Sequence, residues 1–181
     1  MIFVAFNLKS IKKMKTLLYL HGLNSCLHDD RRETLQNYDI EILAPSIDYE
    51  GKHDLLDIFV EKYKSMDLIV GSSAGGLLGY YLSGILQIPA ILFNPALPFA
   101  KNYINLPKLA PREKFLQVVI GAQDKVVPPL ETFKILNSDD LKNASMEIHW
   151  HNQMEHSLPI DIFTEEIAYF FNKIFRQNNF K

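Results

Sequence analysis

The chain lacks the features that mark several classes of protein. It contains one cysteine, Cys26, in 181 residues, so an internal disulfide framework is excluded and a reducing compartment is favoured. Its net charge of -2 offers no general electrostatic attraction to nucleic acid or to anionic lipid. We therefore predict no nucleic-acid partner and expect a small-molecule ligand.

The first residues of the sequence do not follow the pattern of a secretory signal. The apolar residues 1–6 come before a group of lysines, which reverses the basic-then-apolar order of such a signal. We therefore expect a cytoplasmic protein. We predict one domain over residues 15–181 and an N-terminal extension over residues 1–14. Because Met14 stands directly before the first strong strand pattern, it is an alternative start of the protein.

Charged residues are missing from Leu68 to Ala100, a run longer than the about 20 apolar residues that a transmembrane helix needs. Glycine, serine, asparagine and proline nevertheless divide this run into short segments. The segments are typical of a strand, a turn, a helix and a second strand at the buried centre of a parallel sheet. We therefore predict no membrane span.

Strand and helix patterns alternate along the whole chain, which indicates crossover connections. The sequence predicts an α/β fold, with a mostly parallel sheet of about six strands, helices on both faces and no cap domain. The predicted strands are residues 17–20, 40–44, 67–70, 90–93, 115–120 and 146–150. The predicted helices are residues 30–36, 55–63 and 74–86, one opened by Pro128 and Pro129, and a closing one over residues 162–174.

The segment Gly71-Ser72-Ser73-Ala74-Gly75 has the pattern Gly-x-Ser-x-Gly between a predicted strand and a predicted helix. This pattern is typical of a nucleophile elbow, a sharp turn that presents a serine above the sheet. Gly71 and Gly75 lack the Cβ atoms that would clash where strand and helix approach. We predict Ser73 as the nucleophile and interpret Ser72 as its neighbour.

A serine nucleophile needs a base and an acid that orients the base. Asp124 follows one late predicted strand and His156 follows the next, which is the order Ser, Asp, His of α/β-hydrolases. Because the carboxyl ends of parallel strands share one edge of a sheet, we expect Ser73, Asp124 and His156 to converge there.

Alternatives to these two partners exist in the sequence. Asp139 or Asp140 is an alternative acid, but Asp124 is favoured because it comes directly after a strand. His149 and His151 flank a tryptophan in the last predicted strand and are interpreted as sheet residues.

An oxyanion hole requires backbone N–H groups aimed at the oxygen that becomes negative. We predict the N–H of Ala74, directly after the nucleophile, and the N–H of Leu23, in the loop after the first strand. Gly22 permits the turn before Leu23, and His21 is predicted to shape this loop. The His, Cys and Asp spacings predict no metal site, and we expect no cofactor.

Three further features allow two interpretations each. The charged residues 29–33 are interpreted as a solvated helix face, although Arg31 or Arg32 could instead contact an anionic substrate such as an acyl-coenzyme A phosphate. Cys26 is interpreted as a small buried hydrophobe rather than a reactive thiol. The proline-rich stretch Pro95 to Lys114 carries large apolar residues, which favours an apolar flap over the site rather than disorder.

The motifs resemble those of the small cap-less bacterial esterases of the α/β-hydrolase superfamily, of YqiA-like type. Residues 19–25 are similar to the oxyanion loop of that group, residues 68–76 to its elbow and residues 93–96 to its following strand end. The resemblance extends over most of the chain from Lys15 onward. It implies a shortened α/β-hydrolase fold that acts on short acyl esters or thioesters.

The resemblance also implies Ser73, Asp124 and His156 as the catalytic triad. Two positions depart from the group: Ala74 replaces a frequent leucine, and Met154-Glu155 adds a carboxylate directly before the histidine. The expected function is therefore a serine esterase or thioesterase. A catalytically silent binding protein with this fold, or an acyltransferase or peptidase with the same triad, are the alternatives.

Overall fold

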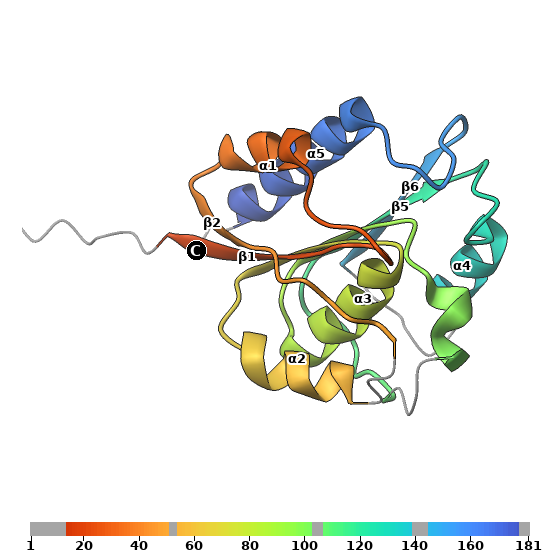
Figure 1. Cartoon of the computed structure of the whole chain (residues 1–181), viewed down its shortest axis with the longest axis horizontal. Helices are drawn as coiled ribbons and strands as arrows, with labels where there is room; N and C mark the ends of the chain where they lie inside the picture. The colour runs from red at the N-terminus through yellow and green to blue at the C-terminus, as the bar shows by residue number, and fades with distance from the viewer. Residues whose placement is uncertain (1–13, 51–53, 103–106, 139–144, 178–181) are drawn as a thin grey trace, which may run out of the picture.

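The computed structural model describes residues 14–50, 54–102, 107–138 and 145–177, in which six parallel strands form one sheet in the order β2-β1-β3-β4-β5-β6 (Figure 1). The strands are β1 Lys15–Leu20, β2 Ile40–Leu43, β3 Leu68–Ser72, β4 Ala90–Phe93, β5 Leu116–Gly121 and β6 Met146–His151. The helices are α1 Asp29–Gln36, α2 Leu55–Tyr63, α3 Ala74–Leu86, the 3₁₀ helix η1 Leu97–Asn102, α4 Pro129–Leu136 and α5 Ile160–Gln177. The predicted parallel α/β fold is confirmed.

Both faces of the sheet are covered, α1 and α5 lying on one face and α2 and α3 on the other (Figure 1). Side chains of a strand alternate between the faces. In β1, Leu17 and Tyr19 belong to the core beneath α1 and α5, whereas Leu18 and Leu20 belong to the core beneath α2 and α3. A strand buried on both faces needs apolar residues at every position, which explains the unbroken apolar runs in the sequence.

Helix α5 provides most of the cover on its face. Its apolar residues recur every three or four positions and are fully or almost fully buried against the sheet. They are Phe163, Ile167, Phe170, Phe171 and Ile174.

The strand order reverses its direction between β1 and β3. From β1 the chain goes outward to β2, then crosses back to β3 on the other side of β1. The connections that leave β1 and β3 therefore run to opposite faces, because α1 follows β1 and α3 follows β3. Parallel sheets bind ligands at such a reversal point, outside the carboxyl ends of the strands.

Several predictions from the sequence lie outside the described residues. They are the N-terminal extension, apart from Met14, and the alternative acids Asp139 and Asp140. Within the described ranges, no helix is both long enough and apolar enough to cross a membrane.

Candidate active site

Ser73 lies in the sharp turn between β3 and α3. Its backbone has φ 53° and ψ -116°, which is a strained conformation for a residue with a side chain. Hydrogen bonds to the end of β4 hold this conformation: the Ser73 N–H donates to the Phe93 carbonyl at 2.9 Å, and the Ala96 N–H donates to the Ser73 carbonyl at 3.0 Å. The turn is thus fixed by the neighbouring strand.

The two glycines of the elbow allow α3 to start directly against the strands. A Cβ atom on Gly75 would lie 2.1 Å from the Leu20 carbonyl oxygen and 2.5 Å from that of His21. A Cβ atom on Gly71 would lie 2.6 Å from the Gly75 carbonyl oxygen. Because the obstructing atoms belong to the backbone, a larger residue at either position requires the strand or the helix to shift.

Asp124 and His156 are hydrogen-bonded to each other. Asp124 follows β5 and is buried, and its Oδ2 lies 2.7 Å from Nδ1 of His156. Its Oδ1 accepts hydrogen bonds from the N–H groups of Val126 and Val127, at 2.8 Å each. A carboxylate only accepts, so the His156 proton is on Nδ1 and the Nε2 of the neutral ring is an acceptor.

Asn94, directly after β4, anchors the loop that carries His156. Its side-chain nitrogen donates to the carbonyl oxygens of Glu155 at 3.0 Å and His156 at 3.2 Å. Its side-chain oxygen accepts from the Gly121 N–H at 2.8 Å. The sequence alone predicted no role for Asn94. The available signal was its position after a buried strand, at the edge where the site residues gather.

His21 orients the loop after β1. Its Nε2 accepts a hydrogen bond from the Ile47 N–H at 2.9 Å, so its ring proton is on Nδ1, which donates to the Gly22 carbonyl at 2.7 Å. In a planar trans peptide the N–H points opposite to the carbonyl. The Leu23 N–H is therefore directed away from His21.

A pocket of about 570 Å³ brings most of the predicted site residues together. Ser73, His156, Leu23 and Ala74 all line it, and Asp124 lies behind His156. The Ala74 N–H belongs to the first residue of α3, where a helix has no internal acceptor. Among the hydrogen bonds of the described residues none joins Ser73 Oγ to His156, a contact that is often long without substrate.

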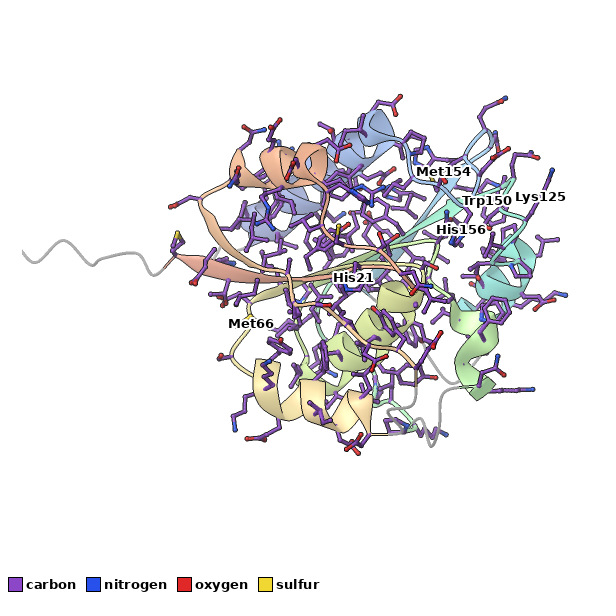
Figure 2. All side chains as sticks on the ribbon, in the orientation of Figure 1. His21, Met66, Lys125, Trp150, Met154 and His156 are labelled. Atoms are coloured by element: carbon purple, nitrogen blue, oxygen red, sulfur yellow. The ribbon has the colours of Figure 1, made fainter. Side chains whose placement is uncertain are left out.

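Polar and apolar side chains both line the pocket around Ser73 and His156. The polar residues include Ser25, His28, Arg31, Asn102 and Ser157. The apolar residues are Ala96, Phe99, Val126, Val127 and Leu158. His156 lies beside the ends of β5 and β6, on the side of the molecule where α4 lies (Figure 2).

Within the described residues of the predicted flap, 95–102 and 107–114, only the first part reaches the pocket. Ala96, Phe99 and Asn102 line it, the last two from η1. The later part packs against α3, since the Arg112 guanidinium is buried there and donates to Ser83 Oγ and to the Tyr80 carbonyl. Burial lowers the pKa of Arg112 from its usual value.

Two other interpretations from the sequence are wrong. Cys26 is exposed, because the loop between β1 and α1 runs over the surface and turns the neighbouring Leu27 inward instead. The description of residues 29–33 as a solvated face does not hold for Arg31, which is half-buried and lines the pocket.

His149 and His151 lie in β6 as sheet residues. Their ring nitrogens each lie 2.6 Å from one carboxylate oxygen of Glu166, a buried residue of α5, which also accepts from Gln117. This cluster was not predictable from the sequence, because its members come from three elements that are distant along the chain. In the described part of the chain, no group of three His, Cys, Asp or Glu residues has the geometry of a metal site.

The fold is shared with solved α/β-hydrolases. Over 89% of this chain and 88% of the other, Est1E from Butyrivibrio proteoclasticus superposes with a TM-score of 0.65 at 16% identity. The mouse α/β hydrolase domain-containing protein 10 gives a TM-score of 0.68 at 13% identity, over 90% and 91% of the two chains. A monoacylglycerol lipase from Paleococcus ferrophilus gives 0.64 at 15%, over 85% and 92%.

At these identities the likeness establishes the fold alone. The family of the protein is shown by its sequence instead. Residues 16–106, half of the chain, match the profile of the uncharacterised protein family UPF0227, and the protein therefore belongs to that family.

Proposed function

We propose that the protein is a serine hydrolase that cleaves carboxylic esters or thioesters with short acyl chains. The observation that carries this proposal is the 2.7 Å contact between Asp124 and His156 beside a pocket that Ser73 and His156 both line. The fold neighbours include proteins named as an esterase and a monoacylglycerol lipase, which supports an ester as substrate.

The reaction would start when His156 Nε2 takes the hydroxyl proton of Ser73 and Ser73 Oγ forms a bond to the acyl carbonyl carbon. The carbonyl oxygen becomes negative and accepts hydrogen bonds from the N–H groups of Leu23 and Ala74. Asp124 keeps the proton of the neutral imidazole on Nδ1 and stabilises the imidazolium that forms.

The tetrahedral intermediate then collapses. The bond to the leaving alcohol or thiol breaks, and His156 gives the leaving group the proton that it took from Ser73. Water next attacks the acyl-enzyme, with His156 accepting its proton, and the carboxylic acid leaves as Ser73 recovers its hydrogen. The apolar lining residues Phe99, Val126 and Val127 offer a surface for a short acyl chain.

Replacing Ser73 by alanine tests the proposal. We expect kcat/KM for p-nitrophenyl butyrate to fall about a thousandfold or more, because the nucleophile is lost while the fold remains. Ser65→Ala is the matched control, since Ser65 is exposed and lies outside the pocket.

A fluorophosphonate probe gives a second readout. Intact-mass and peptide mapping should place one covalent adduct on Ser73 and none on the neighbouring Ser72. Full activity in Ser73→Ala, or a wild-type protein without an adduct on Ser73, would refute the proposal, and the second result would favour a silent hydrolase fold.

A further inference from the structure

The Arg31 side chain lines the pocket and is held there by contacts with its neighbours. Arg31 belongs to α1, which packs beside α5 (Figure 1). One terminal nitrogen donates to the Tyr19 hydroxyl at 3.2 Å, and the other donates to the Leu158 carbonyl at 3.0 Å. The guanidinium carbon lies 5.5 Å from the centre of the Phe163 ring. These contacts come from β1, from α5 and from the loop between His156 and α5. Together they hold the Arg31 side chain in one place.

Among the described residues, no acidic side chain forms an ion pair with this cation. Within the described ranges, no Asp or Glu oxygen lies at ion-pair distance from the Arg31 guanidinium. The nearest carboxylate along the chain, Asp30, accepts from the backbone N–H of Arg31 at 2.7 Å instead.

Both acceptors of the guanidinium are neutral groups. One is a backbone carbonyl, and the other is a phenol, since burial raises the pKa of Tyr19 and keeps its hydroxyl protonated at neutral pH. Two of five N–H groups are used by these acceptors, so further donors remain for a ligand.

We propose that Arg31 recognises an anionic group of the substrate, and that the preferred substrates are esters or thioesters that also carry a carboxylate or a phosphate. This inference rests on the proposed hydrolase function. A planar guanidinium suits both anions, because two parallel N–H groups match two oxygens. Ser25 and Ser157 also line the pocket and add two hydroxyl donors to it.

The polar and apolar side chains of the lining then divide the substrate. The anionic group binds at Arg31, while the apolar part lies against Phe99 and Val126. A neutral ester of equal length contacts the apolar side chains but leaves the Arg31 cation without a counter-charge.

Two matched pairs of substrates test the inference. The first pair places the charge in the acyl half: mono-p-nitrophenyl glutarate against p-nitrophenyl pentanoate. The second places it in the alcohol half: phosphoethyl butyrate against butyl butyrate, followed by titration of released acid. We expect kcat/KM to favour the anionic member of at least one pair by about 10- to 100-fold, because a hydrogen bond to a charged group is stronger than a neutral one.

The charge preference should depend on Arg31 and on salt. In Arg31→Gln the ratio within the favoured pair should fall to near one, and Arg31→Lys should retain part of it. Arg32→Gln is the matched control, because Arg32 is the next residue of α1 and does not line the pocket. Raising the ionic strength should lower the wild-type ratio, since salt screens the attraction.

The outcomes separate this inference from the proposed function. Hydrolysis of both members of both pairs at similar rates overturns the inference alone. So does a ratio that survives in Arg31→Gln while both rates fall, since Arg31 would then only support the His156 loop through Leu158. If no ester is cleaved and no fluorophosphonate adduct forms on Ser73, the proposed function itself is wrong.

A measurement on the wild-type protein does not depend on how the variants fold. Glutarate and inorganic phosphate should compete with p-nitrophenyl pentanoate, whereas the neutral diamide of glutarate should not. Equal inhibition by glutarate and its diamide would contradict recognition of charge by Arg31.

Discussion

Replacement of Asn94 by alanine tests how the loop of His156 is held at the end of the sheet. Asn94 is 3% exposed, and its side chain makes three hydrogen bonds, to the Gly121 N–H and to the carbonyls of Glu155 and His156. Its backbone has φ 42°, a conformation that asparagine adopts more readily than alanine.

The size of the effect follows from these contacts. Leaving the buried Gly121 N–H without an acceptor costs about 2 kcal/mol, and the two lost bonds to carbonyls cost about 1 kcal/mol each. The positive φ adds up to about 1 kcal/mol for alanine. We therefore expect Asn94→Ala to lower the free energy of unfolding by about 4 to 5 kcal/mol, and Asn94→Gly by about 1 kcal/mol less.

Urea denaturation measures this loss directly. The single tryptophan, Trp150, lies in β6 and serves as the fluorescent probe. At low temperature, where the variants remain folded, kcat/KM for p-nitrophenyl butyrate should fall at least about tenfold, because misplacing a catalytic group by about 1 Å is that costly. A loss of stability below about 1 kcal/mol with unchanged kcat/KM would show that Asn94 does not anchor the loop.

Two further substitutions test the packing of the sheet. Gly75→Ala should destabilise the protein by more than about 3 kcal/mol in urea denaturation, because its Cβ would lie 2.1 Å from the Leu20 carbonyl oxygen. Gly79→Ala is the control and should lower the free energy of unfolding by less, because its Cβ would meet only side-chain atoms, at 3.0 Å or more. Glu166→Ala should lower the free energy of unfolding by about 3 kcal/mol, because it removes the buried partner of His149 and His151. It should leave kcat/KM unchanged, because these three residues do not line the pocket. Thermal and urea unfolding measure the second effect, and a variant of wild-type stability would contradict it.

The local patterns of the chain were enough to predict its elements. The helix over residues 74–86 and the strand over residues 90–93 have the predicted bounds. β6 ends one residue beyond its predicted end, and β5 starts and ends one residue later than predicted. Such elements follow from hydrophobic periodicity and from glycine and proline, which act over a few residues. The elbow is predictable for the same reason, since Ser73 and its two glycines are within five consecutive positions.

The roles of polar residues were less predictable, because their partners are distant in sequence. Arg31 and Leu158 are 127 positions apart, and Asn94 and Glu155 are 61 apart. No local pattern distinguishes Arg31 from Arg32, although only the first reaches the pocket. The burial of Cys26 was predicted from the average behaviour of the residue type, whereas the path of one surface loop decides its exposure.

The sequence by itself determined the parallel α/β fold, the position of the elbow, and the order in which Ser73, Asp124 and His156 follow their strands. These features depend on short-range patterns and on the rule that the carboxyl ends of parallel strands share one edge of the sheet. Only the tertiary structure decided which side chains meet at that edge. The contact of Asp124 with His156, the anchoring by Asn94 and the cation of Arg31 in the pocket wall all depend on packing between distant segments. That packing sets the chemistry of the pocket, since a charge or a hydrogen-bond donor acts only where its neighbours leave it available.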